Sequence, residues 1–280
     1  MPILPSLSAL AVAGLLLIPA VRSQAGSPSN VLLVRNRTEP SVAVNPRDPR
    51  MIVLTTNTDY SASTGGIYPT AYFTSHNSGR SFLQGAAPEV SPYVVGADPT
   101  AAIDRNGTVF YSYLSETASY CSTGHSAVML SHSTDGGRSF RGPRIVDTNG
   151  ADDKPNMAVE SHRGRPSHVF VTWTRFHDST RSTDVWYARS MDGGTSFRRT
   201  LLYTSRGDNL GSVPVNGRHG RIYVFWVSFI DKSENLTGST RILFRASRND
   251  GRHFGPVRQA GSSFQRVPLE ASPGALRNLT

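Results

Sequence analysis

Short hydrophobic runs separated by polar turns recur along the chain from about residue 39 onwards. The runs are rich in valine, isoleucine, tyrosine, phenylalanine and tryptophan, which is typical of half-buried β-strands. Glycine, asparagine, aspartate and proline separate the runs, and Asn106-Gly107 is a tight-turn signal between two of them. No run after the N-terminal segment favours a helix, so the pattern predicts an all-β protein. The predicted strands are Glu39–Val44, Met51–Thr56, Thr70–Ser75, a short strand after Phe82, Pro99–Ile103, Thr108–Leu114, Ala127–His132, Asn156–Val159, His168–Thr174, Asp184–Arg189, Ser212–Val215, Arg221–Phe229 and Arg241–Ala246.

One eight-residue motif occurs four times at a nearly constant interval. Its final phenylalanines are 58, 57 and 57 residues apart. A fixed period of this size indicates a repeat architecture, in which each repeat is one supersecondary unit stacked on its neighbours. Each period is therefore expected to hold one four-stranded sheet. The four copies are Ser75–Phe82, Ser133–Phe140, Ser190–Phe197 and Ser247–Phe254.

The residue types of this motif predict a rigid turn between the third and fourth strands of each unit. The Asp or Asn at its third position is expected to accept hydrogen bonds from backbone N–H groups two or three residues further on. The glycines supply positive φ angles, and the final aromatic is expected to enter the apolar layer. The polar atoms are used within the turn, which makes the motif structural rather than catalytic.

The four motifs resemble the Asp-boxes, or BNR repeats, of the sialidase superfamily. Two copies match the consensus, whereas Asn77 and Asn249 replace the aspartate and His253 replaces the hydroxyl residue. The resemblance implies a β-propeller of four-stranded antiparallel blades, with the boxes on the bottom turns and away from the active site. Family members have six blades, so four recognisable blades imply a truncated chain, an unusually small ring, or pairing with another chain.

The N-terminal segment is expected to be a secretion signal. Its apolar run, Leu7 to Ala20, is of signal-peptide length and short for a bilayer span. We therefore predict a cleaved signal peptide over residues 1–25, a secreted protein, and one propeller domain over residues 26–280. Residues 30–35 are expected to form an outer strand that closes the ring. The expected blades cover residues 39–95, 96–151, 152–207 and 208–262.

Charge and composition exclude some classes of function. The net charge of +9 comes almost wholly from arginine, and the arginines are scattered rather than clustered. A positive field attracts anionic glycans or nucleic acid, whereas scattered arginines are also typical of solvated surfaces, and no basic stripe predicts nucleic-acid binding. The single cysteine, Cys121, excludes an intramolecular disulfide. The histidines show no metal-ligand spacing and Asp152-Asp153 is the one adjacent carboxylate pair, so neither a metal nor a cofactor is predicted. Trp173, Trp186, Trp226, Tyr111 and Tyr113 are expected to pack between blades.

Propeller geometry assigns the remaining loops to one face. Successive strands reverse direction, so the connections opposite the boxes form the top face, where binding sites are expected. We expect a glycan or another anionic ligand to bind there, and we expect no insertion into a membrane. The predicted top-face segments are Arg35–Glu39, Asn57–Pro69, Gly96–Asp98, Ser115–Gly124, Asp152–Lys154, Arg175–Thr183, Arg206–Asn209 and Ile230–Gly238.

The resemblance also implies site residues. In sialidases three arginines bind the substrate carboxylate, a Tyr–Glu pair supplies the nucleophile and an aspartate is the acid/base. Arg37 precedes the first strand as the first family arginine does, with Arg35 as the alternative, and Asp98-Pro99 resembles the Asp-Pro that opens the second blade and contacts the sugar. For Arg175 we weigh carboxylate binding against an ion pair with Asp178 or Asp184. The candidate catalytic residues are Asp59, Asp98 and Asp208, and the candidate substrate-binding residues are Arg37, Arg175, Asp153 and Tyr60.

These observations lead to two hypotheses for function. The first is an exo-α-sialidase-like retaining glycoside hydrolase acting on a terminal sialic acid or a related anionic sugar. The second is a non-catalytic propeller that binds a glycan or a protein, as a truncated or degenerate sialidase-like module would. The third arginine and the nucleophilic tyrosine belong to family blades that have no counterpart in this sequence.

Overall fold

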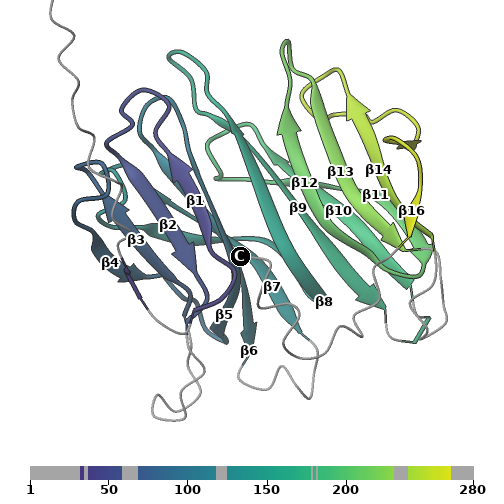
Figure 1. The fold of residues 1–280 in the computed structure, drawn as a ribbon, viewed down its shortest axis with the longest axis horizontal. Coiled ribbons are helices and arrows are strands. Elements are labelled where there is room, and N and C mark those ends of the chain that lie inside the picture. Colours follow the sequence, from purple (N-terminus) through teal and green to yellow (C-terminus); the bar gives the residue numbers. More distant parts are fainter. Residues whose placement is uncertain are drawn as a thin grey trace, which may run out of the picture. The chain divides into compact units, whose positions relative to one another are not determined.

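The computed structural model of the chain consists of β-strands and turns in its described part (Figure 1). No helix long and apolar enough to cross a membrane occurs in this part. The predicted signal peptide lies outside the described residues. Of the predicted closing strand 30–35, residues 32–34 are described, and they form no strand because their backbone has no ladder partner. The described residues are 32–34, 37–58, 69–117, 125–177, 179–180, 182–229 and 239–265.

Blade one is a four-stranded sheet in the order β1-β2-β3-β4, and every neighbouring pair is antiparallel. Its strands agree with the predicted runs to within a few residues. The hydrophobic pattern was thus sufficient to find them. They are β1 (Ser41–Val44), β2 (Ile52–Thr56), β3 (Ala71–Ser75) and β4 (Leu83–Ala86).

Blades two and three form one seven-stranded sheet, ordered from β5 to β11. They are joined because β8 is continuous: its residues 141–150 pair with β7 and its residues 151–160 pair with β9. The segment 152–154, which was predicted to be a loop, is therefore part of a strand. The strands are β5 (Tyr93–Ile103), β6 (Val109–Thr117), β7 (Ser126–Ser133), β8 (Arg141–Glu160), β9 (His168–His177), β10 (Ser182–Ser190) and β11 (Arg198–Arg206).

Blade four has the order β12-β13-β14-β15, and β16 also pairs with β14. All four units are thus antiparallel blades of four strands or more, as the repeat period predicted. The strands are β12 (Asn209–Asn216), β13 (Ile222–Phe229), β14 (Ser239–Ser247), β15 (Arg258–Gln259) and β16 (Phe264–Gln265).

The apolar core lies between neighbouring blades. Tyr72 of blade one packs with Tyr111 and Met129 of blade two. A second cluster joins blade two to blade three around Trp173, and a third joins blade three to blade four around Trp226. Both tryptophans are almost fully buried. Their predicted packing between blades is therefore confirmed.

The four repeated motifs form the same turn. In the second copy the Asp135 carboxylate accepts hydrogen bonds from the Ser139 backbone N–H at 3.0 Å and from the Ser139 hydroxyl at 2.5 Å. Sequence analysis missed the role of the first residue: the Ser133 hydroxyl oxygen accepts from the Gly137 N–H at 2.8 Å. The other three copies repeat this serine–glycine bond. Phe140, like the last residues of the third and fourth copies, packs against a core cluster.

We expect Asp135→Ala to lower the free energy of unfolding by about 1–2 kcal/mol, as loss of a helix cap does. Asp135→Asn should cost less than half as much, because Asn77 and Asn249 accept the same backbone bond in their own turns. Hydrogen bonds from Ser133 and Ser139 lower the pKa of Asp135. Its contribution is therefore present above the unfolded pKa and is lost as the pH falls through the lower folded value. Denaturant unfolding at pH 7 and in acid measures both effects; equal losses for the two variants would contradict the prediction.

Candidate functional site

The first strands of blades two, three and four each contain a bulge, whereas β1 of blade one pairs with β2 without a register shift. In blades two, three and four the pairing register shifts between Ala97 and Thr100, between Asp153 and Asn156, and between Leu210 and Val213. Bulges of this kind redirect side chains and are frequent beside active sites. The residues at these bulges, together with those just before β1, line a pocket of about 340 Å³. They are Glu39-Pro40-Ser41, Asp98-Pro99-Thr100, Lys154-Pro155-Asn156 and, from blade four, Gly211 and Val213.

The backbone is strained at the bulges of blades two and three and at the corresponding position just before β1 in blade one. Glu39, Asp98 and Lys154 have φ angles of 55°, 50° and 49°. A left-handed conformation costs a residue with a side chain roughly 1–2 kcal/mol. Blade four has Gly211 there, with φ 62° and without that cost. Three blades thus keep a charged side chain where glycine is the unstrained choice, and strain of this kind concentrates at functional sites.

The three charged side chains meet in the pocket. The Lys154 ammonium lies 3.0 Å from Asp98 Oδ1 and also contacts the Glu39 carboxylate. Asp98 Oδ2 accepts from the Lys154 backbone N–H at 3.1 Å, and Asn57 donates to Glu39 Oε2 at 3.1 Å. A hydrogen bond with Asp98, followed by burial, raises the pKa of Glu39. Burial opposes protonation of Lys154, but its bonds to the two carboxylates outweigh this and raise its pKa.

Glu116 adds a fourth ionisable group. It lies near the end of β6 and is half-buried. Burial, followed by the negative charges of Asp98 and Asp153, raises its pKa to about 7. Near neutral pH this carboxyl group therefore holds a proton for a large share of the time, which is the property a general acid requires.

Of the predicted site residues, some lie at or beside the pocket and others do not. Asp98 lines the pocket, and Asp153 lies beside Lys154 where its charge acts on Glu116. Arg37 is half-buried, and its Nε has no hydrogen-bond partner among the described residues. Asp208 is exposed just before β12. Asp59 and Tyr60 lie outside the described residues.

Arg175 is occupied by an internal ion pair. Its Nε lies 2.7 Å from Asp152 Oδ1, and its Nη2 lies 2.7 Å from Asp147 Oδ2. Its guanidinium also lies over the Trp186 ring, 5.5 Å from the centroid. The proposed pairing with Asp184 is wrong: although Asp184 faces Arg175 across the β9–β10 ladder, it bonds to His177 instead. Asp178 lies outside the described residues.

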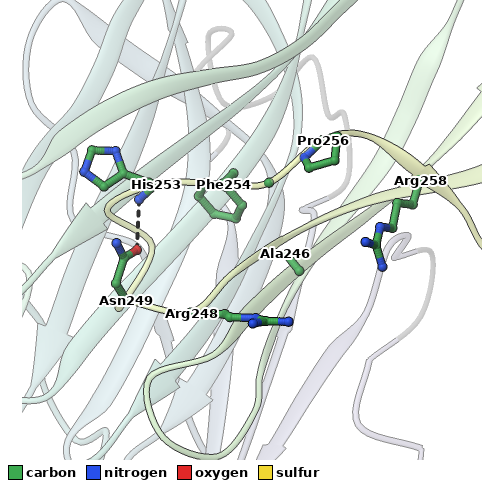
Figure 2. A pocket seen from close by; sticks show the side chains of 8 residues that line it. Ala246, Arg248, Asn249, His253, Phe254, Pro256 and Arg258 are labelled. Atoms are coloured by element: carbon green, nitrogen blue, oxygen red, sulfur yellow. Dashed lines mark hydrogen bonds between the residues drawn. The ribbon is translucent and has the colours of Figure 1, made fainter.

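A larger hollow of about 480 Å³ lies beside the fourth repeated motif (Figure 2). Figure 2 shows Asn249 and His253 facing each other across the turn, where the His253 N–H donates to Asn249 Oδ1 at 3.0 Å. Arg248 extends away from that turn. The asparagine oxygen is thus used by the turn itself, and none of the described residues that line the hollow carries a carboxyl group. The smaller pocket at the bulges has the reactive groups.

Sequence reasoning missed three members of the site. Glu39 and Lys154 lay within the predicted top-face segments but were not named as site residues, although the proline that follows each of Glu39, Asp98 and Lys154 marks their shared position. Glu116 belongs to no motif, and its perturbed pKa arises from neighbours that only the fold brings together. No spacing rule finds such a residue.

The fold was compared with known proteins. No family model matches the sequence, and no curated protein matches it. Solved structures do match. The α-L-arabinanase of Penicillium chrysogenum, complexed with arabinobiose, is 12% identical with a TM-score of 0.59, and the match covers 80% of this chain and 66% of that chain. The α-L-arabinofuranosidase Arb93A of Fusarium graminearum, with an iminosugar inhibitor, is 10% identical with a TM-score of 0.61. That match covers 82% of this chain and 68% of that chain.

A sialidase is also among the matches. The NanB sialidase of Streptococcus pneumoniae is 8% identical with a TM-score of 0.55, and the match covers 83% of this chain and 52% of that chain. The chain thus spans between about half and two thirds of the length of these three proteins. Identities this low carry information about the fold alone. On that basis, the chain has the fold of the sialidase-like β-propellers.

Proposed function

We propose that the pocket at the bulges binds a sugar and that the chain is a glycoside hydrolase. Glycoside hydrolysis commonly uses two carboxyl groups in different protonation states. Glu116, whose pKa is raised to about 7, supplies the proton to the leaving oxygen. Asp98, held by two bonds from Lys154, is the negatively charged partner. The observation that carries the proposal is the raised pKa of Glu116 beside the Asp98 carboxyl group that Lys154 holds in place, since a general acid needs a proton near neutral pH.

We propose a neutral sugar as the substrate. Glu39, Asp98, Asp153 and Glu116 place acidic groups at or beside the pocket, against the single ammonium of Lys154. Such a surface disfavours an anionic ligand. Hydrolysis of a sialoside, which the sequence resemblance implies, needs several free arginines to bind the substrate carboxylate. Arg175 is not free, because it pairs with Asp152 and Asp147. Two of the similar structures hold arabinobiose, a neutral sugar, which supports the same choice.

A panel of fluorogenic glycosides tests this proposal on the full chain. We expect release of the fluorophore from an α-L-arabinofuranoside or another neutral glycoside, and none above buffer from a sialoside. Turnover of the sialoside alone would contradict the neutral-sugar assignment and return support to the sialidase hypothesis. Absence of turnover across the panel, with the protein folded by circular dichroism, would contradict the enzymatic proposal.

One observation favours the second hypothesis, a binding module. The Lys154 ammonium contacts both pocket carboxylates, so neither is free in this arrangement. A binder needs only such fixed donors and acceptors. Calorimetric titration with arabinobiose separates the two: binding without turnover supports the module, whereas binding with hydrolysis supports the enzyme.

A further inference from the structure

Three potential metal ligands meet at the turn between β8 and β9, and none of them lines the proposed pocket or belongs to a repeated motif. Glu160 and His168 are direct partners in the β8–β9 ladder. Facing residues of an antiparallel pair have their Cβ atoms about 4.5–5.5 Å apart. His162 follows Glu160 by two residues and completes the group. The three ligand atoms all lie within 4.8 Å of one another.

The contacts within this group leave one atom without a partner. His162 Nε2 lies 2.9 Å from His168 Nδ1, so one nitrogen must carry the shared proton and the other must accept it. Glu160 Oε2 lies 3.8 Å and 3.9 Å from these nitrogens, is shielded from solvent, and has no hydrogen-bond partner among the described residues. A buried carboxylate oxygen in this state is costly. A cation between the three atoms would satisfy all of them at once.

We propose that Glu160, His162 and His168 bind one divalent transition-metal ion, with zinc as the ion of best fit. Two imidazole nitrogens and one carboxylate oxygen are a common zinc ligand set, with bonds of about 2.0–2.2 Å. Such bonds at tetrahedral angles place the ligand atoms about 3.3 Å apart. The observed separations of 2.9, 3.8 and 3.9 Å bracket this value, so small side-chain movements suffice.

The ligand set and its exposure define the site further. Calcium and magnesium prefer shells made of oxygen atoms, which two imidazoles do not provide. The three side chains keep 16–30% of their surface exposed. A water molecule can therefore occupy the fourth coordination position, and an ion can enter from solvent.

The position of the group indicates a structural role. Lys154 lies in the pocket at the bulges. Glu160 lies six residues further along β8, which is about 20 Å in an extended strand. The turn between β8 and β9 instead contacts blade two. The Arg105 N–H donates to Ser161 Oγ at 2.8 Å, and Ser167 Oγ donates to Asp104 Oδ2 at 2.7 Å. A bound ion would therefore fix the turn that holds blades two and three together at this end.

Zinc titration of the chelator-treated full chain tests the proposal. Isothermal calorimetry should show one zinc ion per chain, and zinc at a hundredfold excess over its dissociation constant should raise the thermal midpoint by roughly 5–10 °C. The double variant His162→Ala/His168→Ala should weaken zinc binding at least about 100-fold. Glu160→Gln, which keeps the shape of the side chain, should weaken it about 10-fold or more. Cobalt substitution should give the visible absorption of a tetrahedral ion.

The matched control is His125→Ala, which removes an exposed histidine outside the group and should leave zinc affinity unchanged. Circular dichroism verifies that each variant is folded; if the double variant is not, Glu160→Gln decides. No zinc uptake by the wild-type chain would overturn the proposal and leave a shared proton as the only link between the two imidazoles. Uptake that is unchanged in Glu160→Gln and the double variant, or equally tight binding of calcium, would overturn it as well.

Discussion

Replacing Glu116 by glutamine will lower kcat/KM for a neutral glycoside by about 10²–10⁴-fold, the usual contribution of general acid–base catalysis. Glutamine keeps the size and most hydrogen bonds of the side chain but cannot transfer a proton to the leaving oxygen. The deficit should shrink for substrates whose leaving group is a weak base, because these need no protonation. Initial rates with an activated and an unactivated glycoside measure both effects. An equal loss for the two substrates would contradict the acid role.

The pH profile adds a second signature. A general acid must be protonated, so wild-type kcat/KM should fall as the pH rises past about 7, the pKa to which burial raises Glu116. Glu116→Gln should lose this limb. The matched control is Glu89→Gln: burial also raises the pKa of Glu89, but the charges of Asp98 and Asp153, which act on Glu116, do not contribute to that rise. We expect its activity to stay within about threefold of wild type, with the limb retained.

Glu116→Gln, which should lower activity, should not lower stability. A carboxyl group whose pKa is raised by folding does not change the free energy of unfolding below its unfolded pKa. As the pH rises from the unfolded to the folded pKa, the group lowers the free energy of unfolding. For Glu116 this window runs from the ordinary 4.5 to about 7. Glu116→Gln should therefore be at least as stable as wild type at pH 8. A functional group that costs stability is typical of an active site, where activity and stability oppose each other.

The fold was predictable because its signals are local and repeated. The motif ending at Phe140 fixes a turn by bonds within eight residues, and four copies in phase define the blade period. The strands of blade one follow directly from runs of β-branched and aromatic residues. The continuous β8 was missed because Lys154-Pro155 looks like a break, whereas the chain passes it as a bulge inside the strand.

The candidate site was less predictable because its members are distant in sequence. Glu39, Asp98 and Lys154 come from three blades, and only the stacking of those blades brings their charges together. Asp98 was found through its Asp-Pro resemblance, while Glu116 had no local signal. The pairing of Arg175 shows the same limit: Asp152 and Asp184 both face it across neighbouring strands, and packing rather than sequence decides between them.

Replacing Arg175 by methionine will lower the free energy of unfolding by about 3–5 kcal/mol, the range for removing one partner of a buried ion pair. The change leaves Asp152, with no exposed side-chain surface, and Asp147, with 4% exposed, without their shared cation. For a chain of this size the thermal midpoint should fall by roughly 6–20 °C. Adding Asp152→Asn to the variant should restore part of the loss, because it removes one of the stranded charges.

The matched control for this pair is Arg199→Met. Arg199 also contacts Asp147, but half of its side chain is exposed, so its removal should cost about 1 kcal/mol or less. Burial raises the pKa of Asp152 against the opposing effect of Arg175, and without that arginine the pKa rises further. An acid with a raised folded pKa destabilises the fold above its unfolded value and is relieved on protonation. The deficit of Arg175→Met should therefore shrink as the pH falls. A deficit that is independent of pH, or no larger than that of Arg199→Met, would instead mean that solvent reaches the pair and that Arg175 is free to bind a ligand.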